Sequence, residues 1–149
     1  MISAQQIKDL REKTGAGISD IKKALEESGG DTAKAQAIIE ERLGSSAGKR
    51  AGRQTLAGTV DAYIHSNTRI GALVELHCET DFVSRNPSFK ALAHDIAMHI
   101  AAMEPADIAA LSAQPFVRDP GKTVADLVNE AIGRFVENIK IGKFVRFEL

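Results

Sequence analysis

Histidine, cysteine and acidic side chains are the groups in this sequence that could hold a metal ion. His77-Cys78-Glu79 matches the first half of a zinc-deaminase signature, but the second half needs a Cys-x-x-Cys pair and Cys78 is the single cysteine. His94 and His99 are five residues apart, which separates them by about 140° around a helix. A zinc pair on one helix needs a spacing of four residues. We therefore expect no metal site.

One segment of the sequence matches part of a phosphate-binding loop motif. The segment from Gly44 to Arg50 is rich in small residues and includes Lys49. Only three residues separate Gly44 from Gly48, and Arg50 stands where a serine or threonine would bind magnesium. No set of nucleophile, base and orienting residue can be named elsewhere in the chain. The sequence therefore predicts a binding protein without a cofactor, and not an enzyme.

The segment Glu-Thr-Asp-Phe-Val at residues 79–83 lies between a strand-like apolar run and a helix that starts near Pro87. A phenylalanine at the tip of such a connection is unusual, because connections run over the surface, where binding residues concentrate. Phe82 could fold back into the core beneath its own loop. It could instead project, beside Asp81, into a pocket of another protein, as aromatic interface anchors do. The local pattern alone favours the buried placement.

Length and composition are typical of a folded protein of one domain, or of one small core with a helical appendage. The chain has 149 residues, 19 Lys+Arg, 20 Asp+Glu and a formal charge of −1, whereas a dedicated nucleic-acid binder is usually basic. No apolar run is long enough to span a bilayer, and no secretory signal is visible at the N-terminus. A single cysteine fits a reducing compartment. We expect a cytoplasmic protein with neither a membrane nor a direct nucleic-acid partner.

Residues 1–44 read as three short helices that form a small bundle. Capping residues predict where the helices begin, and they are Ser3 with Gln6, then Ser19, then Asp31. Glycines predict where the helices end, at Gly15-Ala16-Gly17, at Gly29-Gly30 and at Gly44. Residues 45–56 read as a linker, because small residues dominate and no apolar period runs through them. Its basic residues, Lys49, Arg50 and Arg53, favour a solvated tether over a nucleic-acid contact.

Residues 57–149 read as a small antiparallel sheet packed with helices. Two alternating runs, near 58–65 and 70–78, predict a hairpin with one buried face. Asn86-Pro87 begins a helix that should cross this hairpin, and Thr123 with Asp126 begins another. Residues 103–121 read as irregular, with a short helical turn near 106–111. The closing strand alternates Ile139, Ile141, Val145, Phe147 and Leu149 with Lys140, Gly142, Phe144, Arg146 and Glu148.

Several blocks of residues, taken in their order, resemble the translation elongation factor Ts family. The resemblance covers nearly the whole chain. The blocks are Leu10-Arg11-Glu12-Lys13-Thr14-Gly15-Ala16-Gly17, Lys22-Lys23-Ala24-Leu25, Tyr63-Ile64-His65, Leu73-Val74-Glu75-Leu76, Cys78-Glu79-Thr80-Asp81-Phe82-Val83, Ala93-His94-Asp95-Ile96-Ala97-Met98-His99-Ile100-Ala101-Ala102 and Glu137-Asn138-Ile139 through Leu149.

This resemblance implies an α+β fold with a ubiquitin-associated-like (UBA-like) three-helix domain at 1–44, a linker at 45–56 and the family's core domain at 57–149. It implies a guanine-nucleotide exchange factor that binds elongation factor Tu and promotes GDP release. The family's Thr-Asp-Phe-Val loop enters the partner and disturbs its magnesium site. By resemblance this role passes to Thr80, Asp81, Phe82 and Val83, which places Phe82 outside the core. A second contact with the same partner would involve Leu10, Arg11, Gly15, Gly17 and Ile18.

The chain departs from the family pattern in three places. Longer relatives carry a helical insertion between the long core helix and the closing strand, which here is reduced to residues 103–122. Val136 stands where the family usually has glycine, and Gly142-Lys143 replaces a basic pair. A reduced sheet leaves an edge strand exposed. We therefore consider a homodimer formed through that edge or through the core helices.

The residues, considered without the family resemblance, are also compatible with two other functions. The first is a helical adaptor without exchange activity, in which residues 1–44 bind peptides or ubiquitin-like partners and the Phe82 loop is irrelevant. The second is an RNA-associated protein that uses Lys49, Arg50 and Arg53, whose binding would have to weaken strongly with salt.

Overall fold

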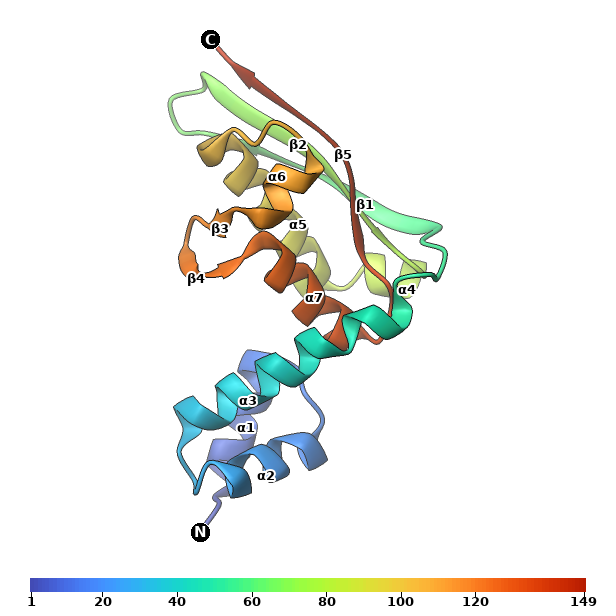
Figure 1. The fold of residues 1–149 in the computed structure, drawn as a ribbon. Helices are drawn as coiled ribbons and strands as arrows, with labels where there is room; N and C mark the ends of the chain where they lie inside the picture. Colours follow the sequence, from blue (N-terminus) through green and yellow to red (C-terminus); the bar gives the residue numbers. More distant parts are fainter.

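The structure is a computed structural model that describes all of residues 1–149. Seven α-helices, one 3-10 helix and five strands follow one another (Figure 1). They are α1 (Ala4–Thr14), α2 (Ile18–Glu27), α3 (Thr32–Ser45), η1 (Ala47–Arg50), β1 (Ala57–Ile64), β2 (Ile70–Cys78), α4 (Asp81–Ser84), α5 (Pro87–Met103), α6 (Ile108–Ala113), β3 (Pro115–Phe116), β4 (Asp119–Thr123), α7 (Val124–Phe135) and β5 (Lys140–Glu148). The predicted α+β class is confirmed.

Capping residues start three helices as the sequence predicts. Ser3, Asp31 and Thr123 each accept hydrogen bonds from backbone N–H groups in the first turn of α1, α3 and α7. The prediction for α2 is wrong, because its N-cap is Gly17, which has no side-chain bond, while Ser19 lies inside the first turn. The turn that follows α1 is so tight that α2 begins almost at once.

The first three helices enclose a core of their own, in the lower lobe of Figure 1. They share small or aliphatic buried side chains at helical spacing. These are Leu10, Ile21, Ala24, Leu25, Ala35 and Ile39, together with Ala16 from the turn between α1 and α2. A core of this size gives limited stability by itself, so contacts with the rest of the chain matter for where this bundle lies.

The main sheet has the strand order β1-β2-β5 and is antiparallel throughout, and α5 packs across one of its faces. In β2 the predicted row of Ala72, Val74, Leu76 and Cys78 is buried. In β1 the apolar residues Val60 and Ile64 face outward, while Thr59, Asp61 and Tyr63 face inward. Directly opposite residues share a face, so the continuous apolar row of β2 determines which side of β1 is covered.

The predicted alternation of β5 is wrong beyond its first residues, because the strand contains a bulge. The register shifts between Val74 and Leu76 of β2, so one extra residue of β5 is accommodated there. The Lys143 N–H in the bulge donates to Glu75 Oε1 at 2.8 Å. Beyond the bulge Phe144 and Arg146 point inward, and Val145 and Phe147 point outward.

The bulge also explains the glycine at position 142. A Cβ atom at Gly142 would lie 2.8 Å from Glu75 Oε1 and even closer to the His77 ring. A side chain at this position would therefore collide with β2 unless these groups moved.

In the region predicted to be irregular, residues 103–121, the short helical turn expected near 106–111 is present as α6, and the β3–β4 hairpin follows it. His99 of α5 holds this segment in place. Its Nδ1 accepts a hydrogen bond from the Val117 N–H at 3.2 Å, its Nε2 lies 2.9 Å from Gln114 Oε1, and its ring stacks on Phe116. Because Nδ1 accepts, the proton of the neutral ring sits on Nε2 and is donated to Gln114.

No helix is long and apolar enough to cross a membrane.

The connection expected to be a solvated tether is partly fixed to the fold. Residues 47–50 form η1, and the side chain of Ala47 is buried. Asn138 Nδ2 donates to the carbonyl oxygen of Arg53 at 2.8 Å and lies 3.4 Å from that of Ala51. Lys49 remains exposed.

Burial lowers the pKa of His99 below its ordinary value of 6.5. The unfolded chain therefore binds a proton at a higher pH than the folded chain does, so stability is complete above about pH 6.5 and falls as the pH drops toward the folded pKa. We expect the free energy of unfolding to fall more steeply between pH 7 and pH 5 in the wild type than in His99→Gln. Urea unfolding at several pH values measures both slopes, and equal slopes would contradict this assignment.

Candidate partner-binding site

Phe82 lies on the outside of the molecule, with 91% of its surface exposed. The local expectation that it is buried is wrong. Residues 81–84 form a single helical turn, α4, in which neighbouring side chains are about 100° apart. Val83, 7% exposed, and Ser84 therefore face the core, and Phe82 faces solvent. Val83 closes the core that Phe82 was expected to close.

Hydrogen bonds at its start fix the position of this turn. Thr80 is the N-cap of α4, and its Oγ1 accepts from the Val83 N–H at 3.4 Å. The Cys78 thiol donates to the carbonyl oxygen of Thr80 at 3.2 Å. Burial raises the pKa of Cys78 to about 11, so the thiol keeps its proton and remains a donor at neutral pH.

Glu137, in the loop between α7 and β5, holds the same segment from the other side. Its Oε1 accepts from the backbone N–H groups of Glu79 and Thr80 at 3.1 and 3.0 Å. Its Oε2 accepts from the Thr80 hydroxyl at 2.7 Å. One carboxylate thus receives three hydrogen bonds from residues far away in the sequence. We call this set of bonds the Glu137 clamp.

A reciprocal contact joins the same two segments. Glu79 Oε1 accepts from the Asn138 N–H at 2.7 Å, and Arg53 lies 3.6 Å from the same carboxylate. Asn138 is buried, and its amide binds the backbone of the connection that precedes β1. Three separate parts of the chain therefore meet behind α4.

The loop that carries Glu137 begins with a strained residue. Val136 has a φ of 59° and ends α7, with its N–H donating to the Ile132 carbonyl oxygen at 3.0 Å. A β-branched residue rarely adopts this left-handed conformation, which costs an L-residue about 1–2 kcal/mol. The conformation turns the chain away from α7, so that Glu137 reaches Thr80.

The resulting surface combines an exposed aromatic ring with exposed polar groups. Thr80 and Asp81 are exposed on either side of the turn's start, next to Phe82. This arrangement offers no nucleophile with a base, but it can insert an apolar ring into a pocket and place a carboxylate beside it. Of the four residues assigned to this site by resemblance, Val83 is the one whose side chain is buried.

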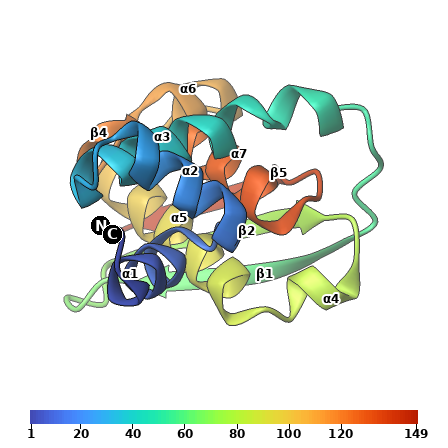
Figure 2. The ribbon, with the colours of Figure 1, turned by 90° about the horizontal axis from the view of Figure 1, so that it is seen from below.

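The residues predicted to make a second contact, on the three-helix bundle, are partly buried and partly exposed. Leu10 is 2% exposed and belongs to the core of the bundle, so its side chain offers almost no surface in this structure. Arg11, Gly15, Gly17 and Ile18 are exposed, and Gly15 also lies against the side chain of Arg134. Figure 2 shows α1 and α4 along the same edge of the view.

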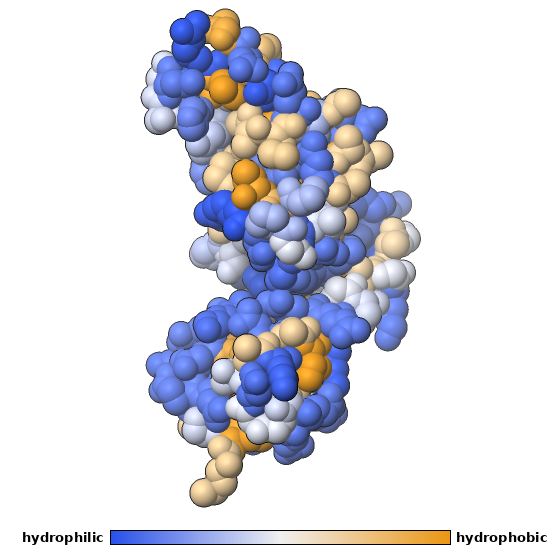
Figure 3. Space-filling model, turned by 60° about the vertical axis from the view of Figure 1, so that its left-hand side comes forward, coloured by the Kyte–Doolittle hydropathy of each residue, from blue (hydrophilic) through white to orange (hydrophobic).

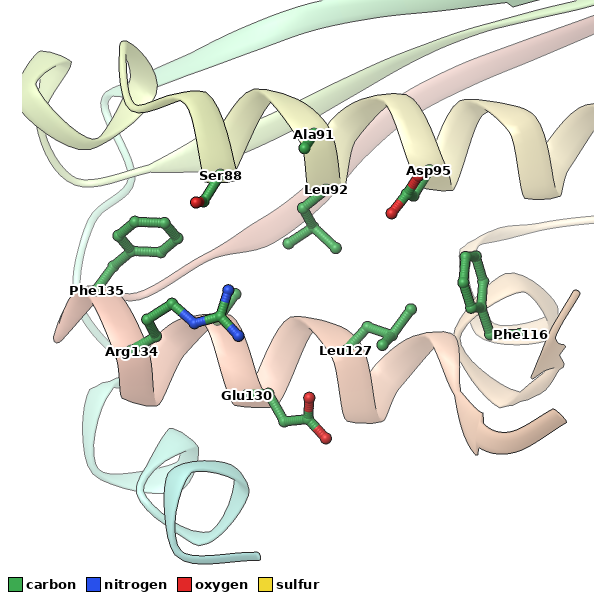
Figure 4. A pocket seen from close by; sticks show the side chains of 10 residues that line it. Ser88, Ala91, Leu92, Asp95, Phe116, Leu127, Glu130, Arg134 and Phe135 are labelled. Carbon is green, nitrogen blue, oxygen red and sulfur yellow. The ribbon is translucent and has the colours of Figure 1, made fainter. Parts of the chain in front are cut away.

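A half-open cleft of about 260 Å³ lies between α5 and α7 (Figure 4). Its charged side chains are already bound within the protein. Asp95 pairs with Arg118, Glu130 with Lys122, and Arg134 donates to the backbone of α1. We therefore assign the polar groups of this cleft to packing of the helices.

Sequence reasoning missed Glu137, Asn138, Glu79 and Arg53 as residues that position the candidate site. The available signal was a polar Glu-Asn pair between a helix and a strand. Nothing in the spacing relates that pair to a threonine more than fifty residues earlier. The relationship exists because β2 and β5 are neighbours in the sheet.

A family model described as Elongation factor TS matches residues 1–109 and, in a second overlapping segment, residues 79–149. The chain is 40% identical over 190 aligned residues to Elongation factor Ts of Rubrobacter xylanophilus, covering 97% of either chain. Elongation factor Ts of Leptospira biflexa is 40% identical over 193 residues, covering 99% of this chain and 98% of the relative. That of Thermoanaerobacter sp. strain X514 is 42% identical over 193 residues, covering 99% and 95%. These alignments exceed 149 residues, so the relatives contain segments that this chain lacks.

Removal of the Glu137 carboxylate should loosen the turn that carries Phe82. Hydrogen bonds to a charged acceptor contribute about 1.5–3 kcal/mol, so we expect Glu137→Ala to lower the free energy of unfolding by roughly that amount. We also expect faster hydrogen exchange at the amides of Thr80 and Val83. Glu137→Gln keeps one acceptor oxygen and should have a smaller effect, and Glu41→Ala is the exposed control. Exchange at these amides that stays at the wild-type rate in Glu137→Ala would show that the clamp does not hold the turn.

Proposed function

Because the chain belongs to the elongation factor Ts family, we propose that it is a guanine-nucleotide exchange factor for elongation factor Tu. It binds the GDP form and promotes release of GDP and its replacement by GTP during translation elongation. The observation that carries this proposal is the exposed Phe82 ring on a turn that is fixed from behind by Glu137. The protein would work in the cytoplasm, without a cofactor and without direct binding to nucleic acid.

The exchange mechanism follows from linkage between two binding equilibria. A factor that binds the nucleotide-free partner more tightly than the GDP form must weaken GDP binding by the same ratio. Phe82 supplies apolar contact that is available only when the partner has opened, and Asp81 adds negative charge close to the ligands of magnesium. No covalent bond forms or breaks on the factor, so it is not an enzyme in the chemical sense.

The residues that touch the partner are fewer than the family motif suggests. Thr80, Asp81 and Phe82 form the contact, while Val83 anchors the turn in the core. On the bundle, the contact consists of Arg11, Gly15, Gly17 and Ile18, and Leu10 supports them from within. Rigid presentation matters here, because ordering a loop at the moment of binding would use up part of the interaction energy.

Truncation of Phe82 tests this function. We expect Phe82→Ala to slow release of fluorescent GDP from elongation factor Tu by a factor that corresponds to roughly 2 kcal/mol or more, the usual loss at an interface anchor. Stability should hardly change, because the ring touches little of its own fold. Met103→Ala, at the far end of α5, removes another exposed apolar side chain and should leave the rate unchanged.

An unchanged release rate in Phe82→Ala would exclude the turn from the mechanism. If residues 1–44 then proved sufficient for binding, the chain would be a helical adaptor instead. The same measurement of fluorescent GDP release, made first with the wild-type protein, shows whether the chain accelerates exchange.

We further infer that two copies of the chain pair, and that they do so through the outer face of the main sheet. The register of β1 and the bulge in β5 turn four large apolar side chains to this face, namely Val60, Ile64, Val145 and Phe147, and Leu73 of β2 lies among them. Phe147 alone is 70% exposed. Four of them, Ile64, Leu73, Val145 and Phe147, border a groove of about 510 Å³ that also includes Leu149. Exposed apolar patches of this kind mark protein interfaces.

The sheet edges are less suited to pairing than this face. The exposed edge strand β5 carries Lys140 and Lys143, and β1 carries the inward-pointing Asp61. Such charges discourage strand addition at an edge.

Light scattering tests the pairing directly. We expect a dimer at micromolar concentration for the wild type and a monomer for Leu73→Glu, because a charge in the centre of the apolar face would be buried without a partner. Lys143→Glu, at the edge of the sheet, should leave the dimer intact. A wild-type protein that is a clean monomer would refute the pairing and leave the exchange function untouched.

A further inference from the structure

We propose that a contact between α3 and α7, which we call the seam, holds the three-helix bundle at one fixed position, so that the bundle surface and the Phe82 turn meet the partner as one rigid body. The residues of the seam are Thr14, Gly15, Glu40, Leu43, Lys122, Glu130, Gly133 and Arg134. The functional consequence rests on the proposed exchange function, whereas the fixed position of the bundle can be tested without it.

Gly133 lets the two helices approach at the centre of the seam. It lies within α7, where glycine is less favourable than alanine by about 1 kcal/mol and so needs a compensating reason. A Cβ atom at Gly133 would lie 2.7 Å from the Cα atom of Leu43 and closer still to the carbonyl oxygen of that residue. These are backbone atoms of α3, which cannot turn aside as a flexible side chain could. The backbones therefore touch only because position 133 has no side chain.

Lys122 joins three elements next to this crossing. Its Nζ lies 2.9 Å from Glu40 Oε2 on α3 and 3.1 Å from Glu130 Oε1 on α7. All three side chains are largely shielded from water, so their attraction is screened less than at an open surface. Burial alone would lower the pKa of Lys122, but the hydrogen bonds to Glu40 and Glu130 outweigh it and raise that pKa. The lysine therefore remains a cation between the bundle and the core.

Arg134 binds the C-terminal end of α1. Its Nε donates to the carbonyl oxygen of Thr14 at 2.9 Å, so a cation satisfies one of the free carbonyl groups at a helix C-terminus. Its side-chain carbons lie against Gly15, where an added Cβ would be 2.7 Å from Cδ. Gly15 has a φ of 69°, and it leaves room for the arginine to pass. Figure 4 shows Arg134 and Glu130 projecting from the same helix.

One short stretch of the chain therefore holds both regions that are proposed to contact the partner, the bundle and the Phe82 turn. Residues 130–134 hold the bundle, and Glu137 and Asn138, which follow directly, hold the Phe82 turn and the connection before β1. Figure 3 shows the two lobes meeting at a waist whose visible rim is hydrophilic, in agreement with the ion pairs found there. The spacing between the bundle surface and Phe82 is thus set through α7.

A fixed spacing changes binding in a specific way. Two contacts on one rigid body bind without the entropic cost of finding each other, whereas two contacts joined by a mobile connection pay that cost at each encounter. Loss of the seam should therefore raise the factor concentration needed for half-maximal exchange by about tenfold. The maximal rate at saturating factor should stay close to that of the wild type, because Phe82 and its clamp are unchanged.

The first experiment compares Gly133→Ala with Gly44→Ala by ¹⁵N relaxation of the full chain. Gly44 lies on α3 beside Leu43 and has open space around it, so an added Cβ meets nothing. We expect one rotational correlation time for bundle and core in the wild type and in Gly44→Ala, and two different times in Gly133→Ala. A single time in Gly133→Ala, with its helices intact, would count against the close approach at Gly133 as the lock, and the second pair of variants then decides for the seam as a whole.

A second pair of variants avoids any steric change in the core. Glu40→Lys reverses one charge of the seam and should separate the two correlation times, and addition of Lys122→Glu should bring them together again in part. Failure of both Glu40→Lys and Gly133→Ala to alter relaxation would refute the seam as a lock.

Exchange assays then test the functional consequence. If the wild type accelerates GDP release and the seam variants need more factor for half-maximal effect at an unchanged maximal rate, the proposal holds. Seam variants that tumble as two bodies yet exchange at wild-type concentrations would refute the rigid-body role alone. A wild type without exchange activity would refute the proposed function instead, and the relaxation result would still decide whether the bundle is locked.

Discussion

The carboxylate of Glu137 is the constraint on which the presentation of Phe82 depends. A single helical turn has almost no stability of its own, since nucleation fixes several residues for one hydrogen bond. Here the turn receives its geometry from outside, through three hydrogen bonds to a carboxylate from the neighbouring loop. The Thr80 cap and the buried Val83 complete the support. A large aromatic side chain can then remain in water without collapsing onto its own fold.

Position 136 shows how the chain tolerates a local cost to maintain this arrangement. Val136 occupies a left-handed conformation that glycine would adopt without strain. The surrounding structure imposes it, because α7 ends one residue earlier and Glu137 must turn toward Thr80.

The sheet illustrates a second constraint, which is register. The apolar row of β2 is continuous and buried, so it fixes which residues of β1 and β5 face α5. A bulge of one residue then reverses the alternation of β5 and exposes Val145 and Phe147. The apolar outer face is a consequence of these two features together, and neither strand shows it when considered alone.

The sequence by itself determined the local structure wherever the cause was local. Capping boxes at Ser3 and Thr123, the proline start of α5 and the apolar period of β2 are properties of neighbouring residues, and they were predicted correctly. The motif resemblance also identified the family and pointed to Phe82. The tertiary structure decided the rest. It buried Leu10 and Val83, assigned the outward faces of β1 and β5, and brought Glu137 to Thr80 and Lys122 to Glu40. These outcomes depend on contacts between residues that are distant in sequence, and no periodicity within one segment can specify them.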